Sequence, residues 1–255
     1  MTANIPRVAL VTGAAKRLGL AMAKDLAKDG FAVAIHANTS LDEAEEAAAA
    51  LVADGHRAIA VKADLSDAEE TETLVDAVKA RLGPVGVLVN NASVFVHDSV
   101  KEMNAKAWDL HFALHVRAPS QLAAALARQL PADAEGLVVN MVDQRVLALN
   151  PRFYSYTLSK SALYTATKTM AQALAPRIRV NAIGPGPTLP NTRQEQEDFD
   201  KQVAAVLLQR GPELDEFGRT IKFLIDTPSI TGQMIALDGG QHLAWQTPDI
   251  MEIRE

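Results

Sequence analysis

The sequence contains no cysteine, which excludes disulfide bonds and metal sites built from thiolates. It has no cluster of basic residues and a formal net charge of −6 at pH 7, so binding to nucleic acid or to an anionic membrane is disfavoured. No apolar run is long enough to span a bilayer. The N-terminus lacks the cationic stretch and apolar segment of a secretory signal. These absences predict a soluble, cytoplasmic protein.

What the sequence does have is a hydrophobic fraction of 48 % over 255 residues, enough for one α/β domain with a substantial core. Short apolar runs alternate with stretches of helix-forming residues. The apolar runs predict seven strands, at residues 7–12, 31–37, 57–63, 85–90, 136–142, 178–183 and 233–237. Between and after them we expect helices at 18–29, 40–55, 66–82, 104–129, 154–175, 195–209 and 212–226.

This alternation predicts a mostly parallel sheet covered by helices on both faces. Such sheets bind ligands at the carboxyl ends of their strands, where the strand order reverses. Ser40 with Glu43 is expected to form a capping box, and Ser66 is expected to cap the helix that follows the third strand.

Gly13 and Gly19 flank the turn between the first strand and the first helix. Glycine lets the backbone approach a phosphate, and the start of a helix offers free N–H donors. The spacing is looser than Gly-x-Gly-x-x-Gly, and Arg17 stands at the middle glycine position. Arg17 can pair with a cofactor phosphate or reach the substrate. A structural turn with a solvated arginine is the alternative.

The end of the second strand distinguishes between nicotinamide cofactors, because an acidic residue there accepts a hydrogen bond from the ribose 2′-hydroxyl of NAD. Asn38, Thr39 and Ser40 occupy that position here, and Lys16 is near it. This combination favours a 2′-phosphate and therefore NADPH. Asp64, after the third strand, is placed to accept from the adenine amino group or to stabilise the start of the next helix.

Tyr156 and Lys160 are four residues apart, which places both side chains on one face of a helix. A neighbouring ammonium favours phenolate, so we expect Lys160 to lower the pKa of Tyr156 and make it a proton donor near neutral pH. Asp143 ends the fifth strand, thirteen residues upstream of Tyr156. A carboxyl whose pKa is raised by burial can supply a proton; a carboxylate that caps the next loop is the alternative.

Four segments occur in the order in which short-chain dehydrogenases/reductases carry them: Thr12-Gly13 with Gly19, Asn90-Asn91-Ala92, Tyr156-x-x-x-Lys160, and Gly-Pro-Gly-Pro at 184–187. The chain resembles that family over nearly its whole length. Most members have serine where Asp143 stands. An aspartate there, with Arg17 in the glycine loop and Asn-Ala-Ser-Val-Phe at 91–95, is similar to pteridine reductases. The stretch around His115 and the ending Leu-Asp-Gly-Gly-Gln-His-Leu at 237–243 resemble the bacterial dihydromonapterin reductases in particular.

The resemblance implies a single doubly wound, Rossmann-type α/β domain over residues 1–255, with a nucleotide-binding half at about 1–135 and a catalytic and substrate half at about 136–255. It implies NADPH-dependent reduction of a dihydropterin or dihydrofolate, in which the carbon of a C=N bond gains hydride and the ring nitrogen gains a proton. The implied cofactor contacts are Gly13, Arg17, Leu18, Gly19, Asn38, Thr39, Ser40, Asp64, Leu65, Asn91, Ala92, Tyr156, Lys160 and Gly186.

By the same resemblance, Phe95 stacks on the pterin ring opposite the nicotinamide, and Ser93 and Arg17 hydrogen-bond the polar edge of the pterin. Asp143 and Tyr156 complete the substrate contacts. A core aromatic that follows a strand is the alternative for Phe95.

The implied catalytic residues are Asp143, Tyr156, Lys160 and His115. Most members have an asparagine, which feeds a proton relay through water, where His115 stands; an imidazole can also relay protons. His111 and His115 have a spacing that can bind metal, but without a cysteine or a local glutamate motif we expect no metal. We place His36, His56 and His97 on the surface or in loops.

Two other functions stay open. The chain could reduce a ketone such as a 3-oxoacyl thioester, or it could bind a nucleotide without catalysis. The family resemblance also implies a homo-oligomer, a tetramer or a dimer. Trp245 could cover the site or meet a partner subunit, and a plain surface aromatic is the alternative.

Overall fold

The protein is described by a computed structural model that covers residues 4–190 and 195–246. Seven strands form one sheet in the order β3-β2-β1-β4-β5-β6-β7, and all neighbouring strands are parallel. The strands are β1 (Val8–Val11), β2 (Ala32–Ala37), β3 (Ala58–Lys62), β4 (Val87–Asn90), β5 (Gly136–Met141), β6 (Ile178–Pro185) and β7 (Met234–Leu237). The predicted seven-stranded α/β sheet is confirmed.

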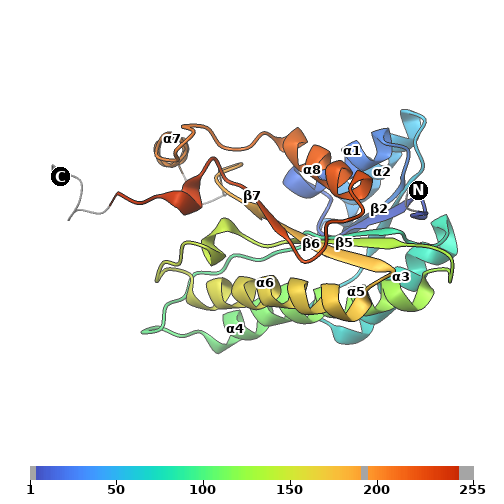
Figure 1. The fold of residues 1–255 in the computed structure, drawn as a ribbon, viewed down its shortest axis with the longest axis horizontal. Helices are drawn as coiled ribbons and strands as arrows, with labels where there is room; N and C mark the ends of the chain where they lie inside the picture. Colours follow the sequence, from blue (N-terminus) through green and yellow to red (C-terminus); the bar gives the residue numbers. More distant parts are fainter. Residues whose placement is uncertain (1–3, 191–194, 247–255) are drawn as a thin grey trace.

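Helices cover both faces of the sheet (Figure 1). α1, α2 and α8 lie on one face, and α3, α4, α5 and α6 lie on the other. The helices are α1 (Arg17–Lys28), α2 (Leu41–Ala53), α3 (Ala68–Leu82), α4 (Ala105–Phe112), α5 (Ala118–Gln129), α6 (Tyr154–Leu174), α7 (Gln196–Ala204) and α8 (Leu214–Asp226). Short helical turns η1 (Ala113–Arg117), η2 (Gln144–Val146) and η3 (Gln241–Leu243) complete the described elements.

Strand β1 shows how the sequence produces this layered arrangement. Its side chains alternate between the two faces of the sheet. Ala9 and Val11 belong to the core under α1 and α8, whereas Val8 and Leu10 belong to the core under α3 and α5. All four residues are buried, which explains why the strand is apolar throughout rather than alternating.

The strand order reverses between β1 and β4, and the carboxyl ends of these strands form the edge of a crevice. Asn91 joins the two ends, because its side-chain amide donates to the carbonyl oxygens of Thr12 at 2.9 Å and Gly13 at 3.0 Å. The preceding residue, Asn90, donates from its side-chain amide to the side-chain oxygen of Asn140 at 2.8 Å and so links β4 to β5.

Two predicted helix caps are wrong. Ser40 precedes α2 without making a side-chain capping bond, and Glu43 instead forms an ion pair with Lys16 at 2.5 Å. Asp67, not Ser66, caps α3, and its carboxylate accepts from the backbone N–H groups of Glu69 and Glu70. Asp67 is one residue nearer to the helix, where its oxygen reaches the free donors of the first turn.

The single helix expected at 104–129 is interrupted in the middle. A π-helical segment, η1, separates α4 from α5, and the backbone N–H of Ala118 bonds to the carbonyl oxygen of Ala113. Pro119 lies just after this segment, and its ring crowds the carbonyl four residues earlier, which belongs to His115. Widening the turn avoids that clash. The buried His115 lies within this π-helical segment.

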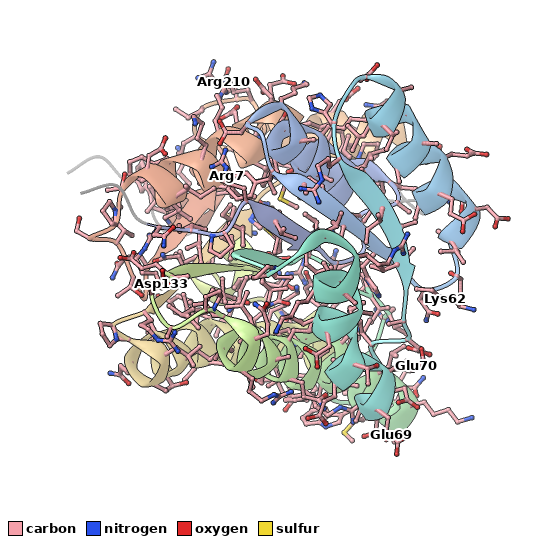
Figure 2. All side chains as sticks on the ribbon, turned by 90° about the vertical axis from the view of Figure 1, so that its right-hand side faces the viewer. Arg7, Lys62, Glu69, Glu70, Asp133 and Arg210 are labelled. Carbon is pink, nitrogen blue, oxygen red and sulfur yellow. The ribbon has the colours of Figure 1, made fainter. Side chains whose placement is uncertain are left out.

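Charged side chains of both signs are spread over the outside of the molecule. Arg7, Lys62 and Arg210 are exposed, as are Glu69, Glu70 and Asp133, and they lie in several well separated parts of the sequence (Figure 2). No described helix combines the length and apolarity of a membrane span.

Candidate active site

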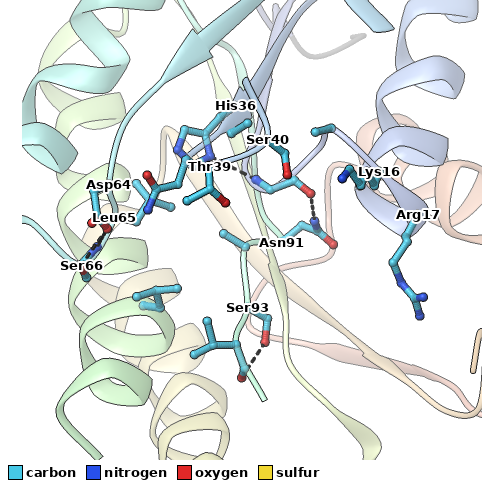
Figure 3. A pocket seen from close by; sticks show the side chains of 18 of the residues that line it. Lys16, Arg17, His36, Thr39, Ser40, Asp64, Leu65, Ser66, Asn91 and Ser93 are labelled. Atoms are coloured by element: carbon cyan, nitrogen blue, oxygen red, sulfur yellow. Dashed lines mark hydrogen bonds between the residues drawn. The ribbon is translucent and has the colours of Figure 1, made fainter. Parts of the chain in front are cut away.

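A cavity of about 610 Å³ opens at the carboxyl ends of β1, β2, β3 and β4 (Figure 3). All of the cofactor contacts expected in the nucleotide-binding half line it, namely Gly13, Arg17, Leu18, Gly19, Asn38, Thr39, Ser40, Asp64, Leu65, Asn91 and Ala92. The other three, Tyr156, Lys160 and Gly186, line an adjoining cavity of about 300 Å³. The fold therefore brings together residues that lie far apart in the sequence.

The glycine loop has little free space at its two glycines. Gly13 has a positive φ of 61°, which glycine adopts readily, and a Cβ there would lie 2.9 Å from the Cα of Ala92. A Cβ on Gly19 would lie 2.5 Å from the carbonyl oxygen of Gly13. Arg17, at the missing glycine position, keeps a glycine-like φ of 55°. The loop thus retains the backbone shape of a glycine turn while it presents a guanidinium.

The guanidinium of Arg17 is not simply solvated, because it also contacts the segment after β6. Its Nη2 donates to the carbonyl oxygens of Pro190 at 3.0 Å and Leu189 at 3.4 Å. Arg17 and Leu189 both line the smaller cavity with Asp143 and Tyr156. Arg17 therefore lies between the expected cofactor and substrate positions.

His36 is not at the surface, contrary to our expectation. It lies in β2, is 2 % exposed, and its Nδ1 accepts a hydrogen bond from the backbone N–H of Gly13 at 3.1 Å. Its Nε2 therefore carries the proton and donates to the carbonyl oxygen of Ala63 at 3.0 Å. Burial lowers the pKa of His36 to about 4. The neutral imidazole thus joins the glycine loop to the end of β3.

Asp64 lines the cavity, and its carboxylate is bonded to Ser66 in the turn that precedes α3. Its Oδ1 accepts from the hydroxyl of Ser66 at 2.7 Å and from the backbone N–H of Ser66 at 2.8 Å. These bonds lower the pKa of the Asp64 carboxyl. The start of α3 is capped by Asp67 instead, so the position of Asp64 in the cavity lining favours the cofactor contact over the helix-stabilising alternative.

Tyr156, Asp143 and Lys160 converge at the inner end of the crevice. The Tyr156 hydroxyl donates to Oδ2 of Asp143 at 2.8 Å. The second carboxylate oxygen, Oδ1, accepts from the backbone N–H of Arg145 at 2.8 Å. Asp143 therefore also caps η2, which was the alternative interpretation of this residue. Lys160 donates from Nζ to the carbonyl oxygen of Met141 at 2.7 Å. Asp143 is thereby fixed at both oxygens.

The expected effect of Lys160 on Tyr156 is wrong for this structure. The pKa of Tyr156 is raised well above its usual value, first by burial and then by the negative charge of Asp143. Burial also lowers the pKa of Lys160, to about 8. The ammonium lies 5.8 Å from the centroid of the Tyr156 ring and is directed at a backbone carbonyl. Desolvation and the nearer carboxylate therefore outweigh the lysine.

Phe95 lies in a wider cavity of about 810 Å³, which Asp143 also lines. Its ring stacks on the ring of Phe153, with centroids 3.9 Å apart, and meets the ring of Tyr156 edge to face at 4.6 Å. The guanidinium of Arg145 lies 5.5 Å from the Phe153 centroid. Sequence reasoning missed Phe153 and Arg145, because neither belongs to a recognisable motif.

His115 and His111 are buried behind this aromatic cluster, at 1 % and 0 % exposure. Nε2 of His115 lies 2.9 Å from the hydroxyl of Ser93 and 3.3 Å from the backbone N–H of Val94. The two imidazole rings stack with centroids 5.5 Å apart. Among the described residues, no group of three acidic, histidine or cysteine side chains is arranged to hold a metal ion.

Comparison with known proteins agrees with this geometry. The profile of the short chain dehydrogenase family matches residues 7–201. The crystal structure of FolM alternative dihydrofolate reductase 1 from Brucella canis, complexed with NADP, is 56 % identical, covers 97 % of this chain and 98 % of that chain, and superposes with a TM-score of 0.94. The corresponding protein from Brucella suis, also with NADP, is 57 % identical over 98 % of this chain and all of that chain, with a TM-score of 0.94.

A more distant relative is the 3-oxoacyl-[acyl-carrier-protein] reductase of Synechocystis, which is 30 % identical over 94 % of this chain and 98 % of its own length. The matched profile covers most of the chain, and the relatives cover 94 % to 98 % of it. The chain belongs to the short chain dehydrogenase family.

Proposed function

We propose that this chain is an NADPH-dependent reductase of a dihydropterin, with dihydrofolate as a further substrate of the same class. The observation that carries the proposal is the 2.8 Å hydrogen bond between Tyr156 and Asp143, beside the cavity that Phe95 lines. The two Brucella proteins, each solved with NADP and named as alternative dihydrofolate reductases, support it.

The residues around the larger cavity fit a nicotinamide dinucleotide phosphate. Gly13 and Gly19 leave no room for a Cβ, so the loop backbone stays open to an approaching pyrophosphate at the start of α1. Lys16, Thr39 and Ser40 offer a cation and two hydroxyls at the end of β2, where a 2′-phosphate needs them. No carboxylate from β2 lies there, and Lys16 pairs with Glu43 of α2 at the rim, so a bound phosphate would share this ammonium with Glu43. When bound, the cofactor supplies the hydride.

The chain's own residues supply the proton that the substrate gains. Tyr156 holds its proton firmly, since its pKa is raised, and the phenol is therefore protonated at the start of a catalytic cycle. Transfer of this proton to the ring nitrogen of a dihydropterin gives the reduced C–N unit its N–H. Asp143, hydrogen-bonded to the same oxygen, is the group through which a proton from solvent returns to Tyr156.

Lys160 and Arg17 have binding roles in this proposal. The ammonium of Lys160 lies 5.8 Å from the centroid of the Tyr156 ring and lines the same cavity, where it can hold a ribose hydroxyl of the cofactor. Arg17 faces the cavity between cofactor and substrate and can donate to the polar edge of a pterin. Ser93 and Phe95 contribute a hydroxyl and an aromatic face.

The alternative is reduction of a 3-oxoacyl thioester, which the Synechocystis relative favours. A carbonyl oxygen needs a neutral donor beside the tyrosine, and here a carboxylate stands in that place. Asp143 therefore argues against simple ketone chemistry.

The test is the consumption of NADPH, followed by absorbance, with dihydrobiopterin, dihydromonapterin, dihydrofolate and an acetoacetyl thioester offered in turn. We expect turnover with the pterins. The Tyr156→Phe variant, which removes only the hydroxyl, should lose turnover and still bind NADPH. Turnover of the thioester alone would replace the proposal with the alternative, and binding of NADPH without any turnover would support a scaffold role.

Assembly and location remain predictions. We expect a homotetramer or homodimer in the cytoplasm, and a measurement of mass in solution tests the assembly. Trp245 is 62 % exposed in the isolated chain, as a residue that contacts a partner subunit would be.

A further inference from the structure

The segment from Ser93 to Asp98, which we call the clamp segment, is tethered at every second residue. The backbone N–H of Val94 donates to Nε2 of His115 at 3.3 Å. The backbone N–H of Val96 donates to Nε2 of His111 at 3.2 Å. A non-helical segment that would otherwise lack partners for these donors is thus held by two buried imidazoles.

The far side of each imidazole is fixed by helix α6. Nδ1 of His111 lies 2.7 Å from the hydroxyl of Ser155, and Nδ1 of His115 lies 2.8 Å from the hydroxyl of Ser159. Ser155 and Ser159 are four residues apart on α6, and His111 in α4 and His115 in η1 have the same spacing, so the two histidines face the two serines as matching rows. The carboxylate of Asp98 completes the arrangement by accepting from the backbone N–H of Ser155 at 3.1 Å.

The direction of these hydrogen bonds follows from the partners. The Ser159 hydroxyl donates to the carbonyl oxygen of Tyr156 at 2.8 Å, so its oxygen must accept from Nδ1–H of His115. Nε2 of His115 then carries the lone pair that the N–H of Val94 needs. His111 has the same tautomer, because its Nε2 accepts from Val96. Burial lowers the pKa of both imidazoles, which keeps them neutral.

We propose that His111 and His115 are positioning residues, which hold the clamp segment so that Ser93 and Phe95 meet the substrate ring. This proposal rests on the proposed function and assigns His115 a role different from a proton relay. Both nitrogens of each ring already have partners, and a relay would require one of them to exchange its partner during each turnover. The hydroxyl of Ser93, 2.9 Å from Nε2 of His115, is oriented by the same lone pair.

The position of Phe95 depends directly on this tether. Phe95 lies between Val94 and Val96, the two residues whose N–H groups are held, and its ring meets Tyr156 edge to face at 4.6 Å. Loosening either end of this short stretch moves an aromatic face that the substrate needs. The cost should therefore appear in substrate binding more than in the chemical step.

Two substitutions of His111 separate the roles of its nitrogens. The amide of His111→Gln reaches the place of Nε2 and can still accept from Val96. The amide of His111→Asn reaches only the place of Nδ1 and can still donate to Ser155. We expect His111→Asn to raise the KM for dihydropterin about tenfold, the effect of one lost buried hydrogen bond. His111→Gln should stay within about threefold of the wild-type KM. The kcat and the Kd for NADPH should change little in both.

The same two variants are compared by amide hydrogen exchange of the NADPH-bound protein, which does not depend on turnover. The amide of Val96 should exchange faster in His111→Asn than in His111→Gln. If the wild type reduces no dihydropterin, the proposed function fails while the exchange comparison still tests the clamp. Equal exchange, an equal rise of KM in both variants, or a lowered Tm with unchanged KM overturns the proposal.

A milder variant covers the case in which His111 cannot be replaced without unfolding. Ser155→Ala removes the hydroxyl behind His111 and leaves the backbone bond to Asp98. We expect the KM for dihydropterin to rise about threefold, because the imidazole loses one of its two anchors. In a Phe95→Ala background the effect should disappear, and a KM effect that persists there would also overturn the proposal.

Discussion

The carboxylate of Asp143 provides the sharpest test of the proposed chemistry, through the Asp143→Asn substitution. Asparagine keeps the size of the side chain and removes its charge. Oδ2 of Asp143 now accepts from the Tyr156 hydroxyl at 2.8 Å, and Oδ1 accepts from the backbone N–H of Arg145 at 2.8 Å. An amide has one oxygen for these two donors, so one of the bonds is lost or reversed.

The magnitude follows from two effects. A hydrogen bond to a charged group contributes about 1 to 1.5 kcal/mol more than one between neutral groups, which corresponds to roughly a tenfold change in rate. Loss of the group that returns the proton to Tyr156 adds a general acid–base contribution of roughly 10² to 10⁴. We therefore expect kcat for dihydropterin to fall at least about 100-fold, with the Kd for NADPH unchanged.

The assay is steady-state reduction of dihydropterin, with Asp143→Ser as the matched control. Serine, the residue that the family resemblance implies at this position, offers a hydroxyl donor but cannot ionise. Both variants should lose activity to a similar extent, because both lack the titrating group. If Asp143→Asn keeps kcat within about tenfold of the wild type, Asp143 only orients Tyr156 and the proton-supply role is refuted.

Three further predictions concern the crevice. Arg17→Gly should raise the KM for dihydropterin about tenfold, because the guanidinium is lost. Its free energy of unfolding should be about 1 kcal/mol higher than that of Arg17→Ala, because only glycine adopts the φ of 55° without strain. Equal stability of the two variants in urea contradicts this. The folded pKa of His36 is about 4 against 6.5 unfolded, so the unfolded state binds more protons between these values and stability falls as pH drops from 6.5 to 4; in His36→Asn that dependence should weaken, as measured by Tm across the window. The pKa of Lys160 is about 8 in the folded state against 10.5 in the unfolded state, so the unfolded state binds more protons between these values. The free energy of unfolding of the ligand-free protein should therefore rise from pH 8 to 10, by up to about 1.4 kcal/mol per pH unit. This slope should be absent in Lys160→Met.

The arrangement of strands and the glycine loop were predictable because their signals are local. Each strand of this parallel sheet is a short apolar run that ends in a polar or glycine residue, and every such run forms a strand within two residues of its expected position. The side chains at those ends, such as Asn38 and Asp64, then had to meet along one edge of the sheet. Tyr156 and Lys160 were found from their spacing on one helix, and Asp143 from its distance to Tyr156.

The sequence could not predict the features that depend on contacts between residues far apart in the chain. Ser40 has a capping sequence but makes no cap, since Glu43 pairs with Lys16 across the loop. His36 is polar and near a turn, yet it is buried because two backbone groups at the ends of β1 and β3 require its nitrogens. The clamp segment depends on partners that are 44 residues apart in the chain.

The order of apolar runs and the residues at their ends thus determined the family, the sheet and the identity of the groups that line the crevice. Only the tertiary structure decided the protonation states of those groups. The pKa of Tyr156 is raised rather than lowered because burial and the carboxylate of Asp143 act at closer range than the ammonium of Lys160. Spacing along a helix says which side chains share a face, whereas protonation depends on the water and charge that the whole fold leaves around each one.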